Sequence, residues 1–130
     1  MATRRQVRQS VISLLYAHEF NTINTEFITE FLELKKIRNE QKTFALALYE
    51  GVRTNLTAIN EKLAPFIKEA QKVSKVEMAI LRLSAFEFCF TDTDKAVIIN
   101  EAIELGKELA NENSPKFINA VLDTMKKELR

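Results

Sequence analysis

The sequence contains very little glycine and proline. Two residues of each in 130 make about 3% of the chain, against roughly 12% for the pair in an average protein. Sheet proteins need a tight turn roughly every 8–12 residues, and those turns depend on Gly, Pro, Asn and Asp. The scarcity therefore argues against an all-β or a doubly wound fold. It predicts helices joined by short connections rich in Asn, Asp and Thr.

Cysteine and histidine each occur once, as Cys89 and His18. A single cysteine excludes a disulfide within the chain and a Cys₄ or Cys₂His₂ zinc site. A single histidine leaves only one base for a Ser-His-Asp or Cys-His site, and His18 shares an apolar helix face with Leu14 and Leu15, as structural histidines do. The sequence also contains no glycine-rich phosphate loop. We therefore predict that the chain is not an enzyme and has no metal and no cofactor.

Long apolar runs are also missing. No segment approaches the roughly 18 apolar residues of a membrane span, and no apolar stretch follows the basic N-terminus as in a signal peptide. We expect a cytoplasmic protein without a membrane role. The net charge is only +1, but it is unevenly distributed: residues 1–18 hold three arginines and no carboxylate, and residues 51–75 hold five basic and two acidic side chains. Local basic patches of this kind can bind a polyanion.

The apolar residues recur at helical spacing along the whole chain. Start and stop signals predict helices over about 4–20, from Asn24 or Thr25 to 38, over 39–63 with a break near 51–55, and over 76–90, 95–109 and 114–129. Residues 76–90 are apolar in nearly every direction, which is typical of a buried helix, whereas Glu101, Glu104 and Glu108 predict a solvated stripe. We predict an all-α, compact single domain over residues 1–130, with about six to seven helices packed around a buried one.

The arginines at the start of the first predicted helix are the most informative feature. Thr3 and Gln6 have the spacing of a capping box, which puts Arg4 and Arg5 in the first turn and Arg8 one turn later. Cations there oppose the positive end of the helix dipole by about 0.3–1 kcal/mol each. Free N–H groups and guanidinium groups together suit a phosphate. A solvated basic terminus is the alternative interpretation of the same pattern.

Two aromatic residues lie beside cations at predicted helix ends. Phe117 follows Lys116 near the start of the last helix, and Phe66 follows Pro65 with Lys68 nearby. An aromatic ring next to a cation can stack on an unpaired base while the charge holds its phosphate. Nine phenylalanines must largely be buried, however, so the alternative is that both rings belong to the core.

Four segments occur in an order that is more specific than any one of them. They are Arg4-Arg5-x-x-Arg8 with Leu15-Tyr16 behind it, Val76-Glu77-x-Ala79-Ile80-Leu81-Arg82, Ile99-Asn100-Glu101-Ala102-Ile103-Glu104-Leu105, and Lys116-Phe117-Ile118-Asn119-x-Val121-Leu122-Asp123. From Arg4 to about Leu122 the sequence thereby resembles the NusB family of bacterial transcription antitermination factors. Gln6, where many members have arginine, and Ala120, where glycine is usual, depart from the family pattern.

The resemblance implies two packed three-helix subdomains and a non-catalytic RNA-binding adaptor. Such an adaptor binds single-stranded boxA RNA in ribosomal RNA leaders together with NusE, a ribosomal small-subunit protein. It also implies assembly on RNA polymerase, a role in ribosomal RNA maturation, and self-association in some members. The residues implied to contact RNA are Arg4, Arg5, Arg8, Phe66, Lys116 and Phe117. Those implied to face the protein partner are Tyr16, Glu77 and Arg82.

Two other hypotheses remain open at this stage. One is a helical protein–protein interaction module or homodimer with no RNA role. The other is an RNA-targeting domain of the kind that precedes RNA cytosine methyltransferases, although 130 residues leave no room for a cofactor-binding sheet.

Overall fold

The computed structural model describes residues 1–68 and 72–129. Within them the elements follow in the order α1 (Arg4–Phe20), α2 (Thr25–Leu34), α3 (Glu40–Thr54), α4 (Leu56–Leu63), the 3₁₀ helix η1 (Ala64–Phe66), α5 (Lys75–Phe90), α6 (Lys95–Leu109) and α7 (Ser114–Glu128). No strand occurs in these residues. The prediction of an all-α fold with about six to seven helices is confirmed.

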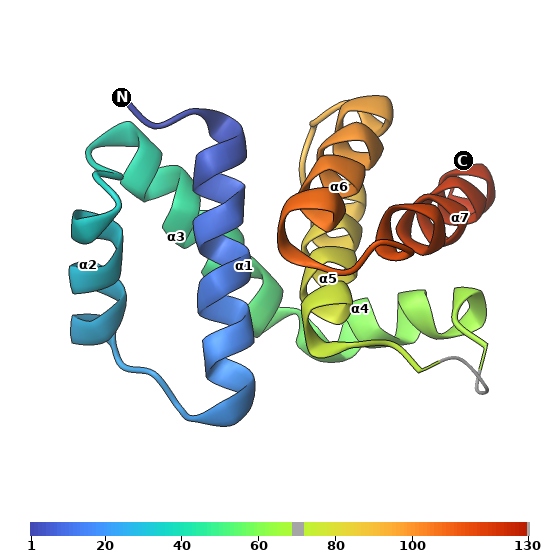
Figure 1. The fold of residues 1–130 in the computed structure, drawn as a ribbon, viewed down its shortest axis with the longest axis horizontal. Coiled ribbons are helices and arrows are strands. Elements are labelled where there is room, and N and C mark those ends of the chain that lie inside the picture. Colours follow the sequence, from blue (N-terminus) through green and yellow to red (C-terminus); the bar gives the residue numbers. More distant parts are fainter. Residues whose placement is uncertain (69–71, 130) are drawn as a thin grey trace.

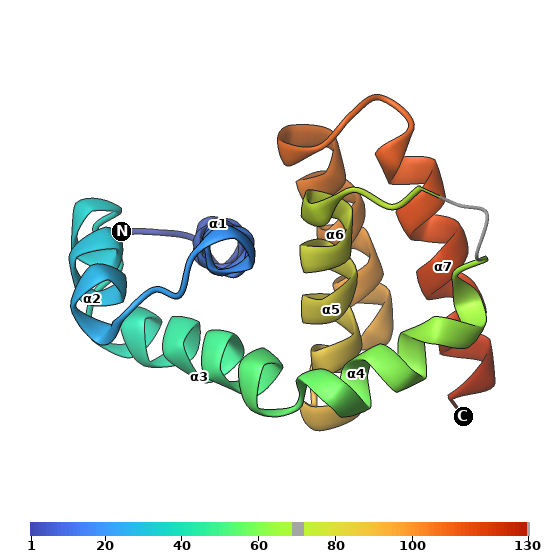
Figure 2. The ribbon, with the colours of Figure 1, turned by 90° about the horizontal axis from the view of Figure 1, so that it is seen from below.

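The helices form two halves that lie side by side (Figure 1). Helices α1, α2 and α3 make up the N-terminal half, and α5, α6 and α7 make up the C-terminal half. Helices α3 and α4 follow one another along one side of the molecule and connect the halves (Figure 2). This arrangement confirms the two three-helix subdomains that the family resemblance implied.

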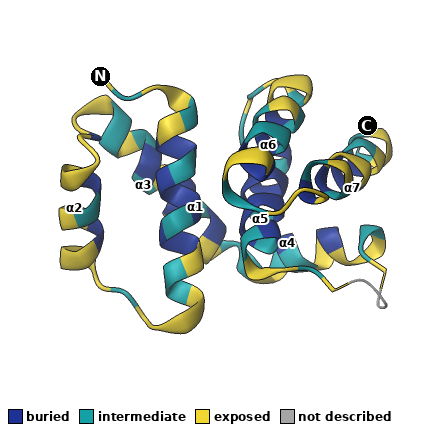
Figure 3. Cartoon of the chain, in the orientation of Figure 1, coloured by how far each residue is buried: buried dark blue, intermediate teal, exposed yellow. Residues whose placement is uncertain are grey.

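Helix α5 lies at the centre and is the most buried element (Figure 3). It contacts α1, α3, α4, α6 and α7, which explains why its sequence is apolar on nearly every side. Its buried residues are Glu77, Ala79, Ile80, Leu81, Leu83, Ser84, Ala85, Phe86, Glu87 and Phe88. Two carboxylates are therefore buried on this helix, and both require partners.

The helix starts follow the predicted capping signals closely. Thr3 and Gln6 form the expected capping box at the start of α1. The side chain of Asn24 accepts a hydrogen bond from the Phe27 N–H at α2, and Asp94 accepts one from the Ala96 N–H at α6. The polar residues between the apolar runs thus satisfy N–H groups that have no partner inside their helices.

Two predicted boundaries were wrong. Helix α2 ends at Leu34 and not at the predicted residue 38, so the cations expected in its last turn, Lys35, Lys36 and Arg38, lie outside it. Lys36 has a φ of 58°, and the N–H groups of Lys36 and Ile37 donate to the carbonyls of Glu33 and Leu32. This is a Schellman ending with lysine at the left-handed position that glycine usually occupies. At α7 the pair Ser114-Pro115 predicts Ser114 as the N-cap and Pro115 as the first helical residue, but the cap is Asn113 and Ser114 is the first helical residue.

Gly51 lies where α3 packs tightly against α5. A Cβ at this position would overlap the ring of Phe86, which is 8% exposed and stacks on Phe90 with 5.4 Å between ring centroids. Glycine is required here because of space and not because of backbone conformation. The contact between Gly51 and Phe86 sets the distance between α3 and α5.

Candidate nucleic-acid and partner interfaces

The first turn of α1 presents arginines without any acidic neighbour on its own helix. No carboxylate occurs in that turn, and Arg4 is exposed. Within the described residues Arg4 has no carboxylate partner; its guanidinium lies instead over the ring of Phe44 from α3, 3.9 Å from the ring centroid. Its edge N–H groups can therefore still be used by a ligand.

Arg5 forms an ion pair with a glutamate of the other half. Its Nη2 and Nε donate to Glu101 Oε2 on α6 at 2.6 and 3.1 Å. The hydrogen bond and the negative charge of Glu101 raise the pKa of the Arg5 guanidinium above its ordinary value. The Arg5 side chain is still 40% exposed. Arg5 is therefore held in place from one side and open to solvent from the other.

Arg8 has a different environment from the two arginines before it. Its side chain is 6% exposed, and its Nε and Nη2 donate to both carboxylate oxygens of Glu87 at 3.0 and 2.9 Å. Glu101 lies 3.9 Å from its Nη1. This buried fork between α1 and α5 leaves Arg8 no open face, so a direct contact to RNA would require the pair to break.

These pairs explain why cations occupy the start of α1. Glu101 on α6 and Glu87 on α5 face α1, and Glu108 accepts a hydrogen bond from the Gln9 side chain at 3.1 Å. The expectation that Glu101, Glu104 and Glu108 form a solvated stripe is therefore wrong for Glu101, whose side chain is 13% exposed. The negative charge that α1 lacks in its own first turn is provided by the neighbouring half.

A groove of about 520 Å³ runs beside α1. Its polar wall consists of Gln6, Gln9, Ser10 and Ser13 from α1, and its other lining residues are Met1, Ala2, Lys35, Lys36, Ile37 and Leu109. The two lysines outside the end of α2 thus face the same groove as α1. Because the lining has basic and polar side chains and no carboxylate, the groove suits an anionic ligand.

The second predicted RNA cluster lies in the C-terminal half. Phe117, near the start of α7, lines a pocket of about 260 Å³ together with Lys72, Glu77, Asn111 and Asn113. Phe117 is half-buried and packs partly on the core, as Phe66 does, and Lys116 is exposed. Helix η1, which carries Phe66, contacts α7.

The turn between α6 and α7 separates this pocket from the groove beside α1. Leu109 lines the groove and Asn111 lines the pocket. The groove beside α1 and the pocket beside Phe117 therefore lie on either side of one short turn.

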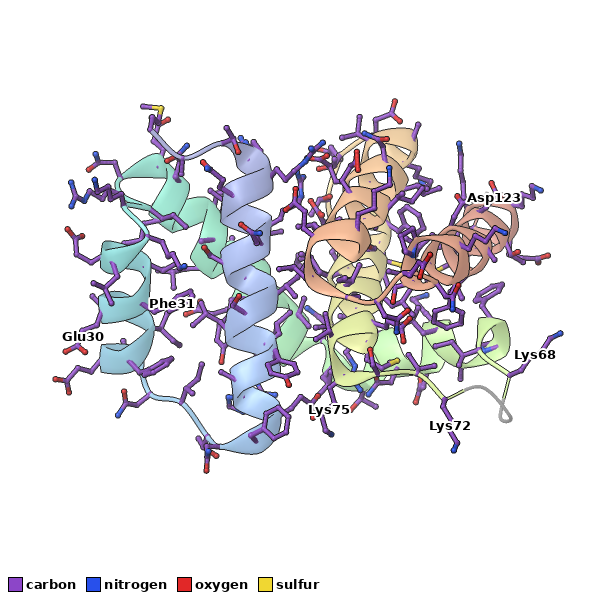
Figure 4. All side chains as sticks on the ribbon, viewed as in Figure 1. Glu30, Phe31, Lys68, Lys72, Lys75 and Asp123 are labelled. Carbon is purple, nitrogen blue, oxygen red and sulfur yellow. The ribbon has the colours of Figure 1, made fainter. Side chains whose placement is uncertain are left out.

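The three residues predicted to face a protein partner have unequal exposure. Tyr16 is 38% exposed and meets Phe20 edge to face, with 4.9 Å between ring centroids. Lys75, at the start of α5, lies beside this end of α1 (Figure 4), and its Nζ is 5.7 Å from the Phe20 ring. Arg82 donates to Glu19 at 2.6 Å and to Asn60 at 3.0 Å.

Glu77, in contrast, is buried at the start of α5. It accepts hydrogen bonds from the Ser74 N–H at 2.9 Å and from the Ser114 hydroxyl at 2.7 Å. Burial raises the pKa of Glu77, but these hydrogen bonds outweigh burial and hold the pKa below its ordinary value. Glu77 therefore ties α5 to the start of α7, and only its edge reaches the pocket beside Phe117.

Sequence reasoning missed several residues of these surfaces. Phe20 follows Tyr16 by four residues, a spacing that puts both on one helix face, so the pattern was available in the sequence. The partners Glu101 for Arg5 and Phe44 for Arg4 had no local signal, because each comes from a distant segment. Among the described residues no cluster of His, Cys, Asp and Glu is suited to a metal, and none of their helices has the length and apolarity of a membrane span.

Comparisons with known proteins agree with this architecture. The family model of the NusB family matches residues 5–127. Transcription antitermination protein NusB of Campylobacter jejuni strain 81-176 is 61% identical over 96% of both chains, and that of Campylobacter lari is 55% identical over the whole of both chains. These matches define a class of transcription antitermination proteins that are not enzymes. The chain belongs to the NusB family.

Solved structures show the same fold. The structure of NusB from T. maritima is similar with a TM-score of 0.84 and 31% identity, and the match covers 98% of this chain and 94% of that one. A chain from a crystal structure of antitermination factors NusB and NusE in complex with dsRNA also has a TM-score of 0.84, at 24% identity and 96% coverage of each chain. The second likeness shows the shared fold alone.

Proposed function

We propose that this protein is a cytoplasmic, single-domain RNA-binding adaptor of transcription antitermination, which binds boxA-type single-stranded RNA together with NusE. The observation that carries the proposal is the start of α1. There two solvent-accessible arginines directly precede Gln6, which lines the basic, polar groove beside α1, in a chain of the NusB family. On RNA polymerase such an adaptor supports antitermination complex assembly and ribosomal RNA maturation.

The RNA surface combines phosphate contacts with base stacking. Arg4 and Arg5 act as the phosphate contacts, since Arg4 has no carboxylate partner among the described residues and Arg5 keeps 40% of its side chain exposed. Arginine binds phosphate through its planar fork of donors. Lys116 and the half-buried rings of Phe66 and Phe117 provide the second cluster, where the exposed edge of a ring stacks on an unpaired base. The turn between α6 and α7 is the path between the clusters.

Arg8 acts on RNA indirectly. Because its fork to Glu87 is buried, it fixes α1 against α5 and so sets where the first turn of α1 lies. We assign Arg8 as a positioning residue and keep Arg4 and Arg5 as the residues that touch RNA.

The partner surface for NusE is centred on Tyr16 and Phe20. Two exposed aromatic rings in edge-to-face contact, with Lys75 and Arg82 nearby, have the composition of an interface centre with a charged rim. Glu77 contributes through the position of α5. A second copy of the chain is the competing occupant, and it would make the protein a homodimer.

The proposal is tested with a labelled boxA-type strand and a scrambled strand in fluorescence anisotropy, with and without NusE. Arg4→Ala combined with Arg5→Ala should weaken binding and reduce the slope of log affinity against log salt by about 1.4, the value for two single-strand phosphate contacts. Lys126→Ala with Lys127→Ala on α7 is the matched control, because it removes the same charge far from the groove. It should leave the slope unchanged.

Each outcome has a distinct meaning. Preference for the boxA-type strand that increases with NusE supports the adaptor. Equal, salt-sensitive binding to both strands would mean that the protein has only a basic patch that binds RNA without sequence preference. No binding to either strand, combined with a stable oligomer in sedimentation, would support the helical interaction module or homodimer instead.

A further inference from the structure

A second pocket lies on the other side of the N-terminal segment from the groove beside α1. It has a volume of about 410 Å³ and lies between the starts of α1 and α3, where Arg4, Arg38, Gln41 and Phe44 line it. The Gln41 side chain donates to the carbonyl of Ala2, so the N-terminal segment is tied to α3 at this point. A volume of this size lies in the range of small-ligand sites, roughly 300–1,000 Å³.

The floor of this pocket is a stacked pair of planar groups. The Arg4 guanidinium lies 3.9 Å from the centroid of the Phe44 ring, and that of Arg8 approaches the same ring at 5.6 Å. Phe44 is half-buried and packs partly against the core. The core therefore supports the ring, and the ring supports the Arg4 guanidinium that lies over it.

The charges around the pocket favour an anionic ligand with a flat ring. Arg4 has no carboxylate partner among the described residues. Arg38 pairs with Glu33 at 2.7 Å, but both side chains are more than half exposed, and an ion pair of this kind is weak and readily exchanged. Of the side chains that line the pocket, Arg4 and Arg38 carry positive charge and only Glu40 carries negative charge.

We propose that this pocket binds one further nucleotide of the RNA, next to those held by the first turn of α1. The base stacks on the face of the Arg4 guanidinium that points away from Phe44, while the Phe44 ring supports the other face, and its phosphate pairs with Arg38. The inference rests on the proposed RNA binding and extends the footprint from α1 onto the start of α3. Stacking on an aromatic or guanidinium plane tolerates any base, so the nucleotide adds affinity without reading sequence.

The test compares RNA strands that differ by one nucleotide. A boxA-type strand is measured beside two strands that carry one extra adenosine, at the 5′ or the 3′ end. We expect the wild-type protein to bind one extended strand at least about fivefold more tightly than the unextended one, the lower end of what stacking provides. Phe44→Leu, which keeps an apolar side chain but removes the ring, should reduce that gain to less than about twofold.

Phe27→Leu is the matched control, because Phe27 is 45% exposed on α2 and does not line the pocket; it should keep the full gain. Replacing the extra adenosine by 2-aminopurine reports stacking directly, as a fluorescence change with the wild type and with Phe27→Leu but not with Phe44→Leu. If circular dichroism shows that Phe44→Leu is unfolded, Arg38→Gln is the variant that tests the inference. Its slope of log affinity against log salt should be smaller than that of the wild type by about 0.7 for the extended strand only.

Binding of the unextended strand without any gain from either extension would overturn the inference and leave the adaptor proposal intact. The same holds for a gain that persists in Phe44→Leu. Failure of the wild type to bind any of the strands would refute both proposals.

Discussion

The buried pair of Arg8 and Glu87 provides the sharpest test of how the two halves are held together. Their side chains are 6% and 2% exposed and share two hydrogen bonds. Glu87→Leu would leave the guanidinium in the core, and breaking a buried pair from one side costs about 3–5 kcal/mol. Because Glu101 lies 3.9 Å away and can partly compensate, we expect a loss of about 3 kcal/mol, or roughly 10 °C in Tm.

Urea unfolding followed by circular dichroism measures this loss. The matched variant combines Arg8→Met with Glu87→Leu, which removes both charges and keeps the volume. Replacing both members of a buried pair by apolar residues is often neutral, so the double variant should recover most of the stability. A loss under about 1 kcal/mol in Glu87→Leu would refute the claim that this ion pair joins α1 to α5 strongly. So would a double variant whose loss equals the sum of the losses of the two single variants.

RNA binding by the same double variant separates the two roles considered for Arg8. As a positioning residue replaced together with its partner, it should leave the salt slope of RNA binding unchanged. A decrease of about 0.7 would instead mean that Arg8 contacts a phosphate of a single strand.

Two further predictions concern the central helix. The hydrogen-bonded carboxylate of Glu77, with its lowered pKa, stabilises the fold above a pH of about 4.3, and this stability is lost as the pH falls through the folded-state pKa. In Glu77→Gln, the urea midpoint of unfolding should therefore decrease less steeply as the pH is lowered into the acid range than it does in the wild type. An equally steep decrease in both proteins would contradict the prediction. Gly51→Ala should cost about 1–3 kcal/mol through overlap with Phe86. Gly106→Ala serves as the milder control in urea unfolding, because its Cβ would approach the flexible end of Ile118 at 3.0 Å and the Pro115 backbone only at ordinary contact distance.

Local signals were sufficient to predict the helices. Thr3, Asn24 and Asp94 each precede an apolar run in the sequence. In the structure each of the three side chains caps the start of a helix. The end of α2 was predicted wrongly because its Schellman turn has Lys36 where the glycine signal was expected. A rule based on residue preference fails when the less favoured residue adopts the same conformation.

The partners of the arginines could not be predicted in the same way. The sequence shows that Arg5 and Arg8 oppose the helix dipole, but it does not show that Glu101 and Glu87 approach from 96 and 79 residues away. Those contacts depend on how the halves pack. Amphipathic periodicity predicts which face of a helix is buried and not which residue of another helix it meets.

The capping box and the Tyr16–Phe20 contact lie at opposite ends of one rigid helix. Twelve residues separate Arg4 from Tyr16, which at about 1.5 Å per residue is about 18 Å along the axis, with the two side chains turned about 120° apart. Ligands at the two ends therefore bind to separate surfaces that do not overlap. The helix geometry itself keeps the angular offset between the two ends constant, and the bidentate fork of Arg8 to Glu87 fixes how α1 is rotated relative to α5. On the proposed assignment of one end to RNA and the other to NusE, a ternary assembly forms in either order of binding, and neither ligand displaces the other.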